Sequence, residues 1–277
     1  QGTLALKNRL VMPPMATSKA EADGSPSQAI LDYYDEKSKG GAISLIIIEH
    51  SYIAPEGKAS ENQLSIAEDR LIEPLRKLSG VINQNGSKAV MQINHAGSNT
   101  SSQITGAVPL APSRVPNPRR SDVPELRELN KEEIRGIVHA FRNAALRVKK
   151  AGFDGVEIHS AHGYLLNQFF SPLTNKRTDE YGGDVLGRIR IHLEVIRAVR
   201  AAVGPDFPIL LRLGASDFRE GGTAIGDSEK AAREFERSGV DILDISGGFC
   251  GYDVPGLTGQ GYFAPLTEAI KKVVSVP

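Results

Sequence analysis

Short apolar runs alternate along the chain with longer amphipathic segments. The apolar runs are rich in Ile, Val and Leu and show little polar alternation, as is typical of strands buried on both faces of a parallel sheet. The strands predicted in this way cover residues 9–13, 44–49, 89–94, 155–159, 208–213 and 242–246. A seventh strand is predicted to begin at Val273 and to run to the end of the chain.

The segments between these runs have the features of helices with defined ends. The predicted helices cover residues 28–39, 69–85, 130–152, 187–203, 227–238 and 265–272. Asn130 and Glu133 form a capping-box pattern at the start of the third helix. Repeated β–α units with right-handed crossovers imply a parallel sheet, and six or more such units favour a (β/α)8 TIM barrel. An open doubly wound sheet is the alternative, but no GxGxxG motif follows the first strand.

Length, charge and cysteine content fit a single barrel domain over residues 1–277. The chain has 277 residues, and barrels of this kind typically have about 250. Lys and Arg together number 33, as do Asp and Glu, so no net charge points to nucleic acid or to an anionic membrane as a partner. The longest apolar run, residues 45–48, is far shorter than the roughly 20 residues that span a bilayer. With Cys250 as the single cysteine and no signal-sequence pattern, we expect a cytoplasmic protein. The sequence leaves open whether it forms a homo-oligomer.

Polar residues stand near the C-terminal ends of the apolar runs, where barrels of this kind carry their active sites. They are Glu49, His50, Gln92, His95, His159, His162 and Arg212. Buried polar groups need partners, so these side chains either pair with one another or bind a ligand. Gln92 can both donate and accept at the edge of a heterocycle. Arg212 can stabilise a developing anion or pair with an inward carboxylate such as Glu49 or Glu157.

His159 and His162 form an HxxH motif with three interpretations. The two imidazoles can make structural hydrogen bonds at a strand end. They can hold a metal together with His95, although no further ligand at a typical spacing completes such a site. They can also donate hydrogen bonds to a substrate oxygen, in which case Tyr164 can supply a proton.

The segment of residues 97–129 departs from the alternation, being rich in Ser, Pro and Arg. Loops of this length in compact domains are usually functional or disordered. Its Arg119 and Arg120 are interpreted as solvated surface rather than as a phosphate site.

Six segments match a family pattern in order over nearly the whole chain. The longest is AGFDGVEIHSAHGYLLNQFFSPLTNKRTDEYGG at residues 151–183. The others are NRLVMPPM at 8–15, IAPEG at 53–57, QINHAG at 92–97, APS at 111–113 and RELNKEEI at 127–134. In these segments the chain resembles the old yellow enzyme family of NADH:flavin oxidoreductases. The resemblance implies a barrel that binds FMN across its strand ends and uses NAD(P)H as reductant.

The resemblance also implies roles for individual residues. The positions that contact the flavin correspond to Pro14, Met15, Ala16, Gln92 and Arg212. The positions that bind the electron-withdrawing group of the substrate correspond to His159 and His162, and Tyr164 corresponds to a proton donor or substrate contact. Arg212 would stabilise negative charge on the reduced flavin.

The chain departs from the family pattern at three places. Ala16 stands where the family commonly has a Cys or Thr that contacts the flavin, so Thr17 is the candidate to replace that contact. Ser98 stands where an Arg is frequent. The family's phosphate-binding residues follow strands seven and eight, whereas the chain ends at Pro277. We therefore expect the last one or two strands of the barrel to be missing and FMN to bind weakly to this chain.

These observations lead to one main hypothesis and three alternatives. The main hypothesis is an ene-reductase that transfers hydride from NAD(P)H through FMN to the activated C=C bond of a small electrophilic alkene, such as an enone, an enoate or a dienoyl thioester. One alternative is the FMN domain of a larger iron–sulfur enoate or 2,4-dienoyl-CoA reductase. The others are a metal-dependent barrel hydrolase that uses His95, His159 and His162, and a non-catalytic fragment.

Overall fold

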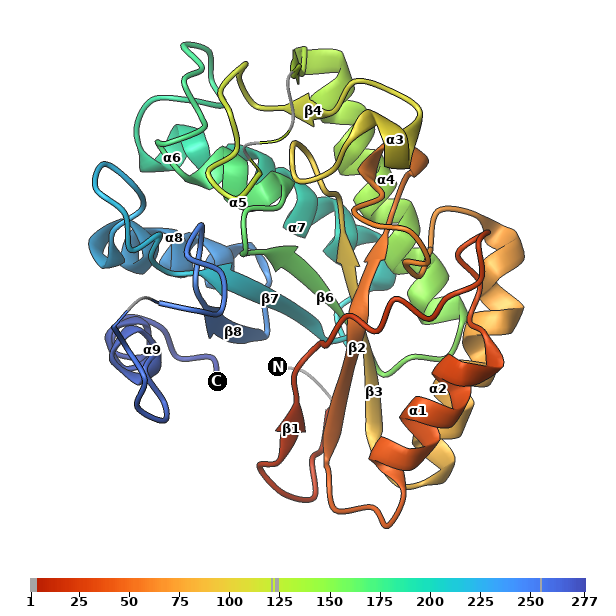
Figure 1. Ribbon diagram of the computed structural model, residues 1–277. Helices are drawn as coiled ribbons and strands as arrows, with labels where there is room; N and C mark the ends of the chain where they lie inside the picture. The colour runs from red at the N-terminus through yellow and green to blue at the C-terminus, as the bar shows by residue number, and fades with distance from the viewer. Residues whose placement is uncertain (1–3, 121, 123–124, 255) are drawn as a thin grey trace.

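Six parallel strands form one curled sheet. The computed structural model describes residues 4–120, 122, 125–254 and 256–277 (Figure 1). The strands lie in the order β1 (Val11–Met12), β2 (Leu45–Tyr52), β3 (Lys88–Asn94), β6 (Gly155–Ser160), β7 (Ile209–Gly214) and β8 (Ile242–Ser246). Their order in space is their order in the chain, without the reversal that marks a doubly wound sheet. Among the described residues β1 and β8 do not pair with each other, so the sheet forms part of a barrel wall.

Helices cover the outside of the curled sheet (Figure 1). The longer ones are α1 (Gln28–Ser38), α2 (Ile72–Gln84), α4 (Lys131–Lys150), α7 (Arg190–Val203), α8 (Ile225–Ser238) and α9 (Ala264–Lys271). The shorter ones are α3 (Ser102–Thr105), α5 (Leu165–Phe170) and α6 (Val185–Arg188), with 3-10 turns at Pro55–Gly57 and Asp69–Leu71. A large apolar core fills the space between the sheet and these helices.

The start of α4 shows the capping box that the sequence predicts. The Asn130 side chain accepts a hydrogen bond from the Glu133 N–H at 2.9 Å, and the Glu133 carboxylate accepts one from the Asn130 N–H at 2.9 Å. Two backbone donors at the helix N-terminus are thereby satisfied. The predicted helix over residues 187–203 is instead two helices, α6 and α7, which meet at Ile189.

A second, smaller apolar cluster lies inside the curl of the sheet. Leu45 and Ile47 of β2 pack there with Val90 of β3 and Leu210 of β7. Leu4 and Leu6, which precede β1, lie against this cluster, as does Ile242 of β8. The interior near the starts of the strands is thus filled by side chains, as in barrels whose core is packed rather than open.

The predicted seventh strand is not formed, and the described part of the long loop at residues 97–129 contains regular elements. The residues from Val273 onward form a turn and coil instead of a seventh strand, and a single backbone hydrogen bond, from Leu243 N–H to Pro277 O at 2.9 Å, joins the last residue to β8. The segment of residues 97–129 is more ordered than its composition suggests, although residues 121, 123 and 124 lie outside the described part. It contains α3 and a small parallel pair, β4 (Leu110–Ala111) and β5 (Arg127–Glu128).

None of the helices in the described part of the chain combines the length and the apolar character that a membrane span requires.

Candidate active site

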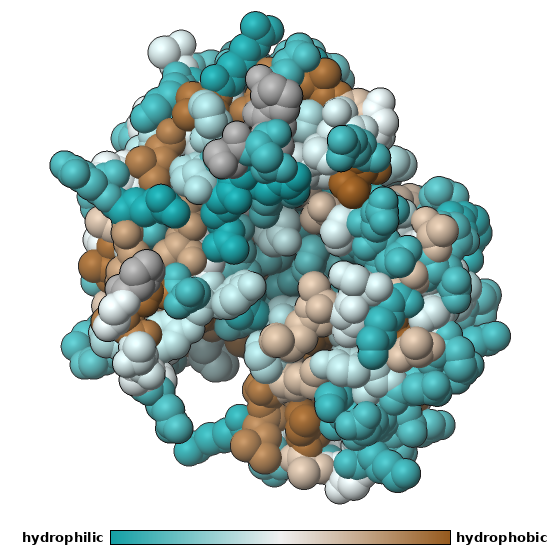
Figure 2. Space-filling view, viewed as in Figure 1, coloured by the Kyte–Doolittle hydropathy of each residue, from teal (hydrophilic) through white to brown (hydrophobic). Residues whose placement is uncertain are grey.

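Side chains that face the inside of the curl change from apolar to polar toward the C-terminal ends of the strands. Alternate residues of a strand face the same side, so the positions that follow the inner apolar cluster also point inward. These positions are Glu49 on β2, Gln92 and Asn94 on β3, Glu157 and His159 on β6, Arg212 on β7, and Asp244 and Ser246 on β8. Figure 2 shows that the molecular face in the same view is hollowed near its centre and is mostly hydrophilic there.

Gln92, Glu157, Arg212 and Asp244 form a chain of polar contacts across four neighbouring strands. Gln92 Nε2 donates to Glu157 Oε2 at 2.6 Å, between residues that are paired in the β3–β6 register. Arg212 Nη1 lies 3.2 Å from Asp244 Oδ2, between residues that are paired in the β7–β8 register. The ion-pair partner of Arg212 is therefore Asp244, and not Glu49 or Glu157, the two carboxylates that the sequence suggested.

Burial is the main influence on the pKa values of the two carboxyl groups in this group of four residues. It raises the pKa of Glu157 well above its usual value, and the nearby Asp244 carboxylate adds to the rise while Arg212 opposes it. Burial also raises the pKa of Asp244, again against the attraction of Arg212. Two carboxyl groups beside one guanidinium cannot both ionise cheaply in a buried site, so the protonated form of Glu157 is favoured. The Glu157 and Asp244 carboxyl groups lie within hydrogen-bonding range of each other, whereas Arg212 Nε has no hydrogen-bond partner among the described residues.

His159 and His162 lie side by side at the end of β6. Their ring centroids are 5.1 Å apart and the rings are nearly perpendicular. His162 has a φ of 59°, in the left-handed region that residues other than glycine seldom adopt. Its N–H donates to Gly247 O at 3.2 Å, and its Nε2 lies 2.7 Å from the Ser246 hydroxyl. The loop after β8 thus holds His162 in an unusual backbone conformation.

Both histidines of this pair are neutral at neutral pH. Burial lowers the pKa of His159 well below its usual value, and the neighbouring His162 lowers it further. Burial likewise lowers the pKa of His162, and the charges of Arg212 and Arg119 add to that effect. A neutral imidazole has one N–H donor and one acceptor nitrogen. His159 Nδ1 is buried and has no partner among the described residues, so it can bind a polar atom of a ligand.

Tyr164 contacts the histidine pair from the start of α5. Its ring centroid is 5.0 Å from that of His159 and 5.1 Å from that of His50, at the end of β2. Burial raises the pKa of Tyr164 to about 12, so its hydroxyl is protonated at neutral pH and can donate. Gln63 Nε2 lies 2.8 Å from His50 Nδ1, and burial lowers the pKa of His50 to about 4.

His95 does not join this cluster. It is fully buried, and its Nδ1 accepts a hydrogen bond from the Gly97 N–H at 3.0 Å. The ring lies so close to Gly57 that a Cβ there would be 2.6 Å from His95 Cδ2. In the part of the chain that the structure describes, no group of three or more His, Cys, Asp or Glu side chains could hold a metal ion. The three histidines of the hydrolase alternative are therefore not arranged as a metal site.

The segment after β1 presents an apolar side chain to solvent. Met15 is 55% exposed, Ala16 is exposed and Pro14 is half-buried. The Thr17 hydroxyl donates to Glu49 Oε1 at 3.0 Å, and the Thr17 N–H donates to the same oxygen at 3.2 Å. Thr17 is thus bound to β2, which argues against its replacing the flavin contact that Ala16 lacks.

Three residues near the cluster were not singled out from the sequence: Asp244, Ser246 and Tyr252. Asp244 and Ser246 stand two residues apart at the end of an apolar run, as Glu157 and His159 do in β6. This shared spacing is a signal that could have identified them. Tyr252 lies in the loop after β8, and no feature of the sequence marked it.

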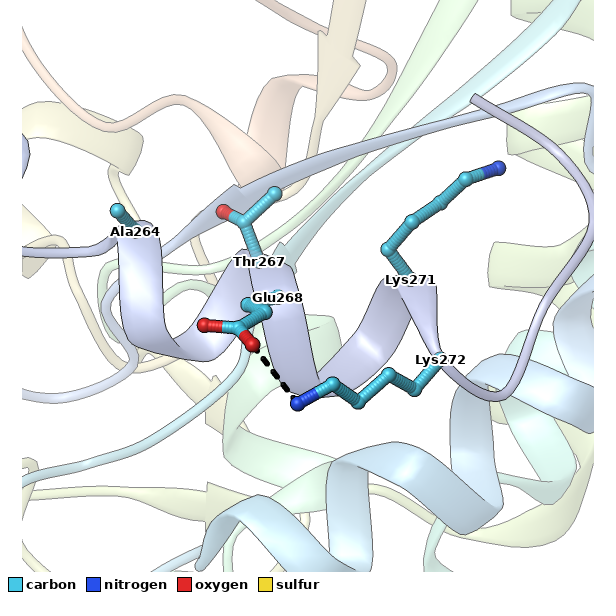
Figure 3. A pocket seen from close by; sticks show the side chains of 5 residues that line it. All are labelled: Ala264, Thr267, Glu268, Lys271 and Lys272. Atoms are coloured by element: carbon cyan, nitrogen blue, oxygen red, sulfur yellow. Dashed lines mark ion pairs between the residues drawn. The ribbon is translucent and has the colours of Figure 1, made fainter.

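The hollow drawn in Figure 3 lies apart from this cluster. It runs along α9 and is lined by Ala264, Thr267, Glu268, Lys271 and Lys272. Lys272 pairs with Glu268 at 2.8 Å, and Lys271 Nζ donates to the carbonyl groups of Ser275 and Val276. Both lysine ammonium groups are engaged, so the hollow offers no free charge to a ligand.

Comparison with known proteins places the chain among flavoproteins. Residues 1–249 match the model of the NADH:flavin oxidoreductase / NADH oxidase family. The NADH oxidase of Thermoanaerobacter brockii is 43% identical over 284 residues, which cover 100% of this chain and 43% of that protein. The chain thus spans less than half the length of this curated relative.

Two solved structures show the same fold. The old yellow enzyme homologue from Zymomonas mobilis has a TM-score of 0.86 at 30% identity, covering 100% of this chain and 78% of that one. A 2-naphthoyl-CoA reductase in complex with 2-naphthoyl-CoA has a TM-score of 0.91 at 27% identity, covering 98% of this chain and 44% of that one. These likenesses confirm the predicted barrel fold, and the family match supports the FMN cofactor. The chain belongs to the NADH:flavin oxidoreductase / NADH oxidase family, which includes the old yellow enzymes.

Proposed function

We propose that the protein is a flavin-dependent oxidoreductase that transfers hydride from NAD(P)H, through FMN, to the activated C=C bond of a small electrophilic alkene. Family membership supports the flavin chemistry. The observation that carries the choice of acceptor is the neutral histidine pair, in which His159 Nδ1 is buried without a partner among the described residues. Such a pair suits the uncharged oxygen of an enone, an enoate or a thioester.

The residues at the strand ends fit FMN. Arg212 Nε is buried and lacks a partner among the described residues, as expected where a polar ligand completes the site. Gln92 and Arg212 would hold the polar edge of the flavin, and Pro14, Met15 and Ala16 would contact its ring. When bound, FMN accepts hydride from the nicotinamide and delivers it to the alkene. Arg212 would supply fixed positive charge beside it.

His159 and His162 would bind the carbonyl oxygen of the alkene. As hydride arrives at the β-carbon, negative charge develops on that oxygen, and preorganised N–H donors stabilise it without reorganisation. Each imidazole is neutral at neutral pH and therefore offers one such donor. Tyr164 keeps its hydroxyl proton and would donate to the α-carbon or contact the substrate.

The test compares the two half-reactions in the FMN-loaded protein by stopped-flow spectroscopy. We expect the variant His159→Ala/His162→Ala to be reduced by NAD(P)H within a few-fold of the wild-type rate. Its reoxidation by 2-cyclohexenone should slow by about 100-fold or more, since loss of one oxyanion donor costs about 3 kcal/mol. The variant His159→Asn/His162→Asn keeps an N–H donor at each position and should recover at least part of the loss. His139→Ala, at an exposed position on α4, is the control.

Two outcomes contradict the proposal. A double alanine variant that keeps its flavin and reduces the enone at the wild-type rate would show that the pair does not bind the substrate oxygen. Loss of a stoichiometric metal together with all activity would favour the hydrolase alternative.

A second candidate is the flavin domain of a larger reductase that acts on CoA thioesters. It is favoured by the TM-score of 0.91 with the 2-naphthoyl-CoA reductase, of which the chain covers 44%. Iron and acid-labile sulfide analysis of the protein expressed from its full-length gene, with crotonyl-CoA and 2-cyclohexenone compared as acceptors, separates the two candidates. Iron–sulfur content with turnover confined to the thioester would support this second form.

A further inference from the structure

A charged side chain stands beside the histidine pair without a carboxylate partner. Arg119 belongs to the segment between β4 and β5, which the buried side chain of Asn117 ties to the end of β6. Asn117 Nδ2 donates to Gly163 O at 3.0 Å, and its Oδ1 accepts from the Arg119 N–H at 2.9 Å. The position of Arg119 is therefore coupled to the turn that carries His162.

Two glycines make room for the Arg119 side chain. A Cβ at Gly163 would lie 2.9 Å from Arg119 Cδ, and a Cβ at Gly251 would lie 1.8 Å from Arg119 Nη1. The guanidinium thus packs directly on the backbone of the loop after β8. Its central carbon lies 6.0 Å from the centroid of the Tyr252 ring, a cation–π contact.

Tyr252 links Arg119 to the proposed substrate site. Its ring centroid lies 6.1 Å from that of His162, with the two rings perpendicular. The Tyr252 side chain is 69% exposed, so a ligand can reach this surface. Guanidinium, phenol and imidazole therefore follow one another along the rim of the strand-end cluster.

The charge of Arg119 is not neutralised within the described part of the chain. Arg120, the next residue, pairs with Asp122 at 3.1 Å, but no carboxylate lies within ion-pair distance of Arg119. Burial lowers the pKa of His162, and the charges of Arg212, Arg119 and His50 lower it further. An uncompensated guanidinium favours a planar anion, which it can bind through two parallel N–H donors.

We infer that Arg119 and Tyr252 form a subsite beside the histidine pair that binds a carboxylate or phosphate carried by the alkene substrate. The inference rests on the proposed function, because it names the substrate class of that site. Tyr252 holds the guanidinium in place through its ring and leaves the N–H donors free for the anion. Neutral alkenes would use the histidine pair alone.

The test uses two acceptors that share one enone and differ by one charge, trans-4-oxo-2-pentenoate and its methyl ester. Steady-state kinetics of the FMN-loaded protein should give a higher kcat/KM for the acid. In Arg119→Gln the KM for the acid should rise about five- to tenfold, as expected for loss of a partly exposed but bidentate ion pair. The values for the ester should stay within twofold. Arg119→Lys should give a KM for the acid between those of the wild type and Arg119→Gln, because an ammonium lacks the planar fork of a guanidinium.

Two controls separate charge recognition from loop stability. Arg120→Gln removes an arginine that Asp122 already neutralises, and it should leave the KM of both acceptors unchanged. Added salt should raise the KM of the acid in the wild type and have less effect in Arg119→Gln, because screening weakens only the ionic contact. Tyr252→Ala should weaken the acid preference, whereas Tyr252→Phe should retain it.

Each contrary result has a distinct meaning. If neither acceptor is reduced, the proposed function fails and the subsite fails with it. If the ester is reduced but Arg119→Gln raises the KM of the acid and that of the ester equally, the contact with Tyr252 is structural only. The inference is then overturned. If Arg119→Gln weakens only the binding of NADH or NADPH in the reductive half-reaction, the anion belongs to the nucleotide, and the inference is again overturned.

Discussion

Gln92 and Glu157 face each other across the β3–β6 ladder, and the Gln92 amide donates to the Glu157 carboxyl group at 2.6 Å. The pair joins a residue that is expected to contact the flavin to a buried acid whose pKa is raised well above its usual value by burial. A protonated carboxyl group and an amide have nearly the same shape and can both accept the Gln92 hydrogen bond. This similarity leads to the first prediction.

Glu157→Gln should leave the free energy of unfolding at pH 7 within about 1 kcal/mol of the wild type, because both side chains satisfy Gln92. Glu157→Ala should cost more, about 1–3 kcal/mol for the unsatisfied Gln92 donor in addition to the loss of packing. Because the pKa of Glu157 is raised in the folded state, that state binds more protons than the unfolded state above about pH 4.3. Wild-type stability should therefore fall as pH rises above that value, and the Gln variant should lack this contribution.

Urea unfolding at several pH values tests both parts of this prediction. A Gln variant as unstable as the Ala variant would mean that Glu157 is ionised in the folded protein.

Tyr164→Phe should slow reduction of an activated alkene by no more than about tenfold, toward the low end of what general acid catalysis contributes. Solvent can replace a proton donor at an accessible carbon, and Tyr164 is only half-buried. Flavin reduction by NAD(P)H should be unchanged, since the ring lies against His159 and His50 rather than against Gln92 or Arg212. Stopped-flow rates with enones of differing α-carbon substitution measure the effect. A loss as large as that of the double histidine variant would assign Tyr164 a larger role.

His192 should contribute to acid unfolding. Its Nε2 lies 2.8 Å from the Ser160 hydroxyl, its ring stacks on Phe235, and burial lowers its pKa to about 3. The unfolded state binds a proton at this position below about pH 6.5, and the folded state does not until near pH 3. Stability should therefore fall by about 1.4 kcal/mol per pH unit for this histidine as the pH is lowered through that range.

Denaturant unfolding between pH 7 and pH 4 measures this slope. In His192→Gln the slope of unfolding free energy against pH should decrease by about 1.4 kcal/mol per pH unit, which corresponds to one proton. His139→Gln, at an exposed position on α4, should match the wild type. Equal slopes for the wild type and His192→Gln would show that another group governs acid unfolding.

Gly248→Ala should destabilise the loop that carries Tyr252. A Cβ at Gly248 would lie 2.1 Å from Asp217 Oδ1, the oxygen that accepts the Phe249 N–H at 2.8 Å. Asp217 also accepts from Ser171 Oγ at 2.6 Å, so its displacement would loosen two loops of the site. We expect a loss of about 1–3 kcal/mol, typical of overpacking a filled space.

Thermal unfolding and limited proteolysis of residues 249–262 measure the effect of Gly248→Ala. Gly259→Ala, in the same loop with no atom within 4 Å of the added Cβ, should behave like the wild type. An unchanged midpoint for Gly248→Ala would show that the loop adjusts without cost.

The sequence by itself determined most of the long helices and the strands of the main sheet, and the level along the strands at which the polar residues lie. Buried runs such as those of β3 and β6, and the capping box of Asn130 and Glu133, depend on residues near one another in the chain, so local patterns predict them. Gln92, His159 and Arg212 were expected at one end of the sheet because position along a parallel strand sets depth in a barrel. The roles of these three residues in binding flavin or substrate stay predictions, whereas the family resemblance is confirmed.

Only the tertiary structure decided which side chains meet. Arg212 pairs with Asp244, 32 positions along the chain, and His162 contacts Ser246, 84 positions away. The contact between Arg119 and Tyr252 joins two loops that share no sequence pattern. The residues from Val273 resemble a strand in composition, but a single backbone hydrogen bond, from Leu243 N–H to Pro277 O, joins them to β8, whereas a strand requires a ladder of such bonds. Partner choice depends on strand register and loop path, which are set by the packing of the whole sheet rather than by any segment alone.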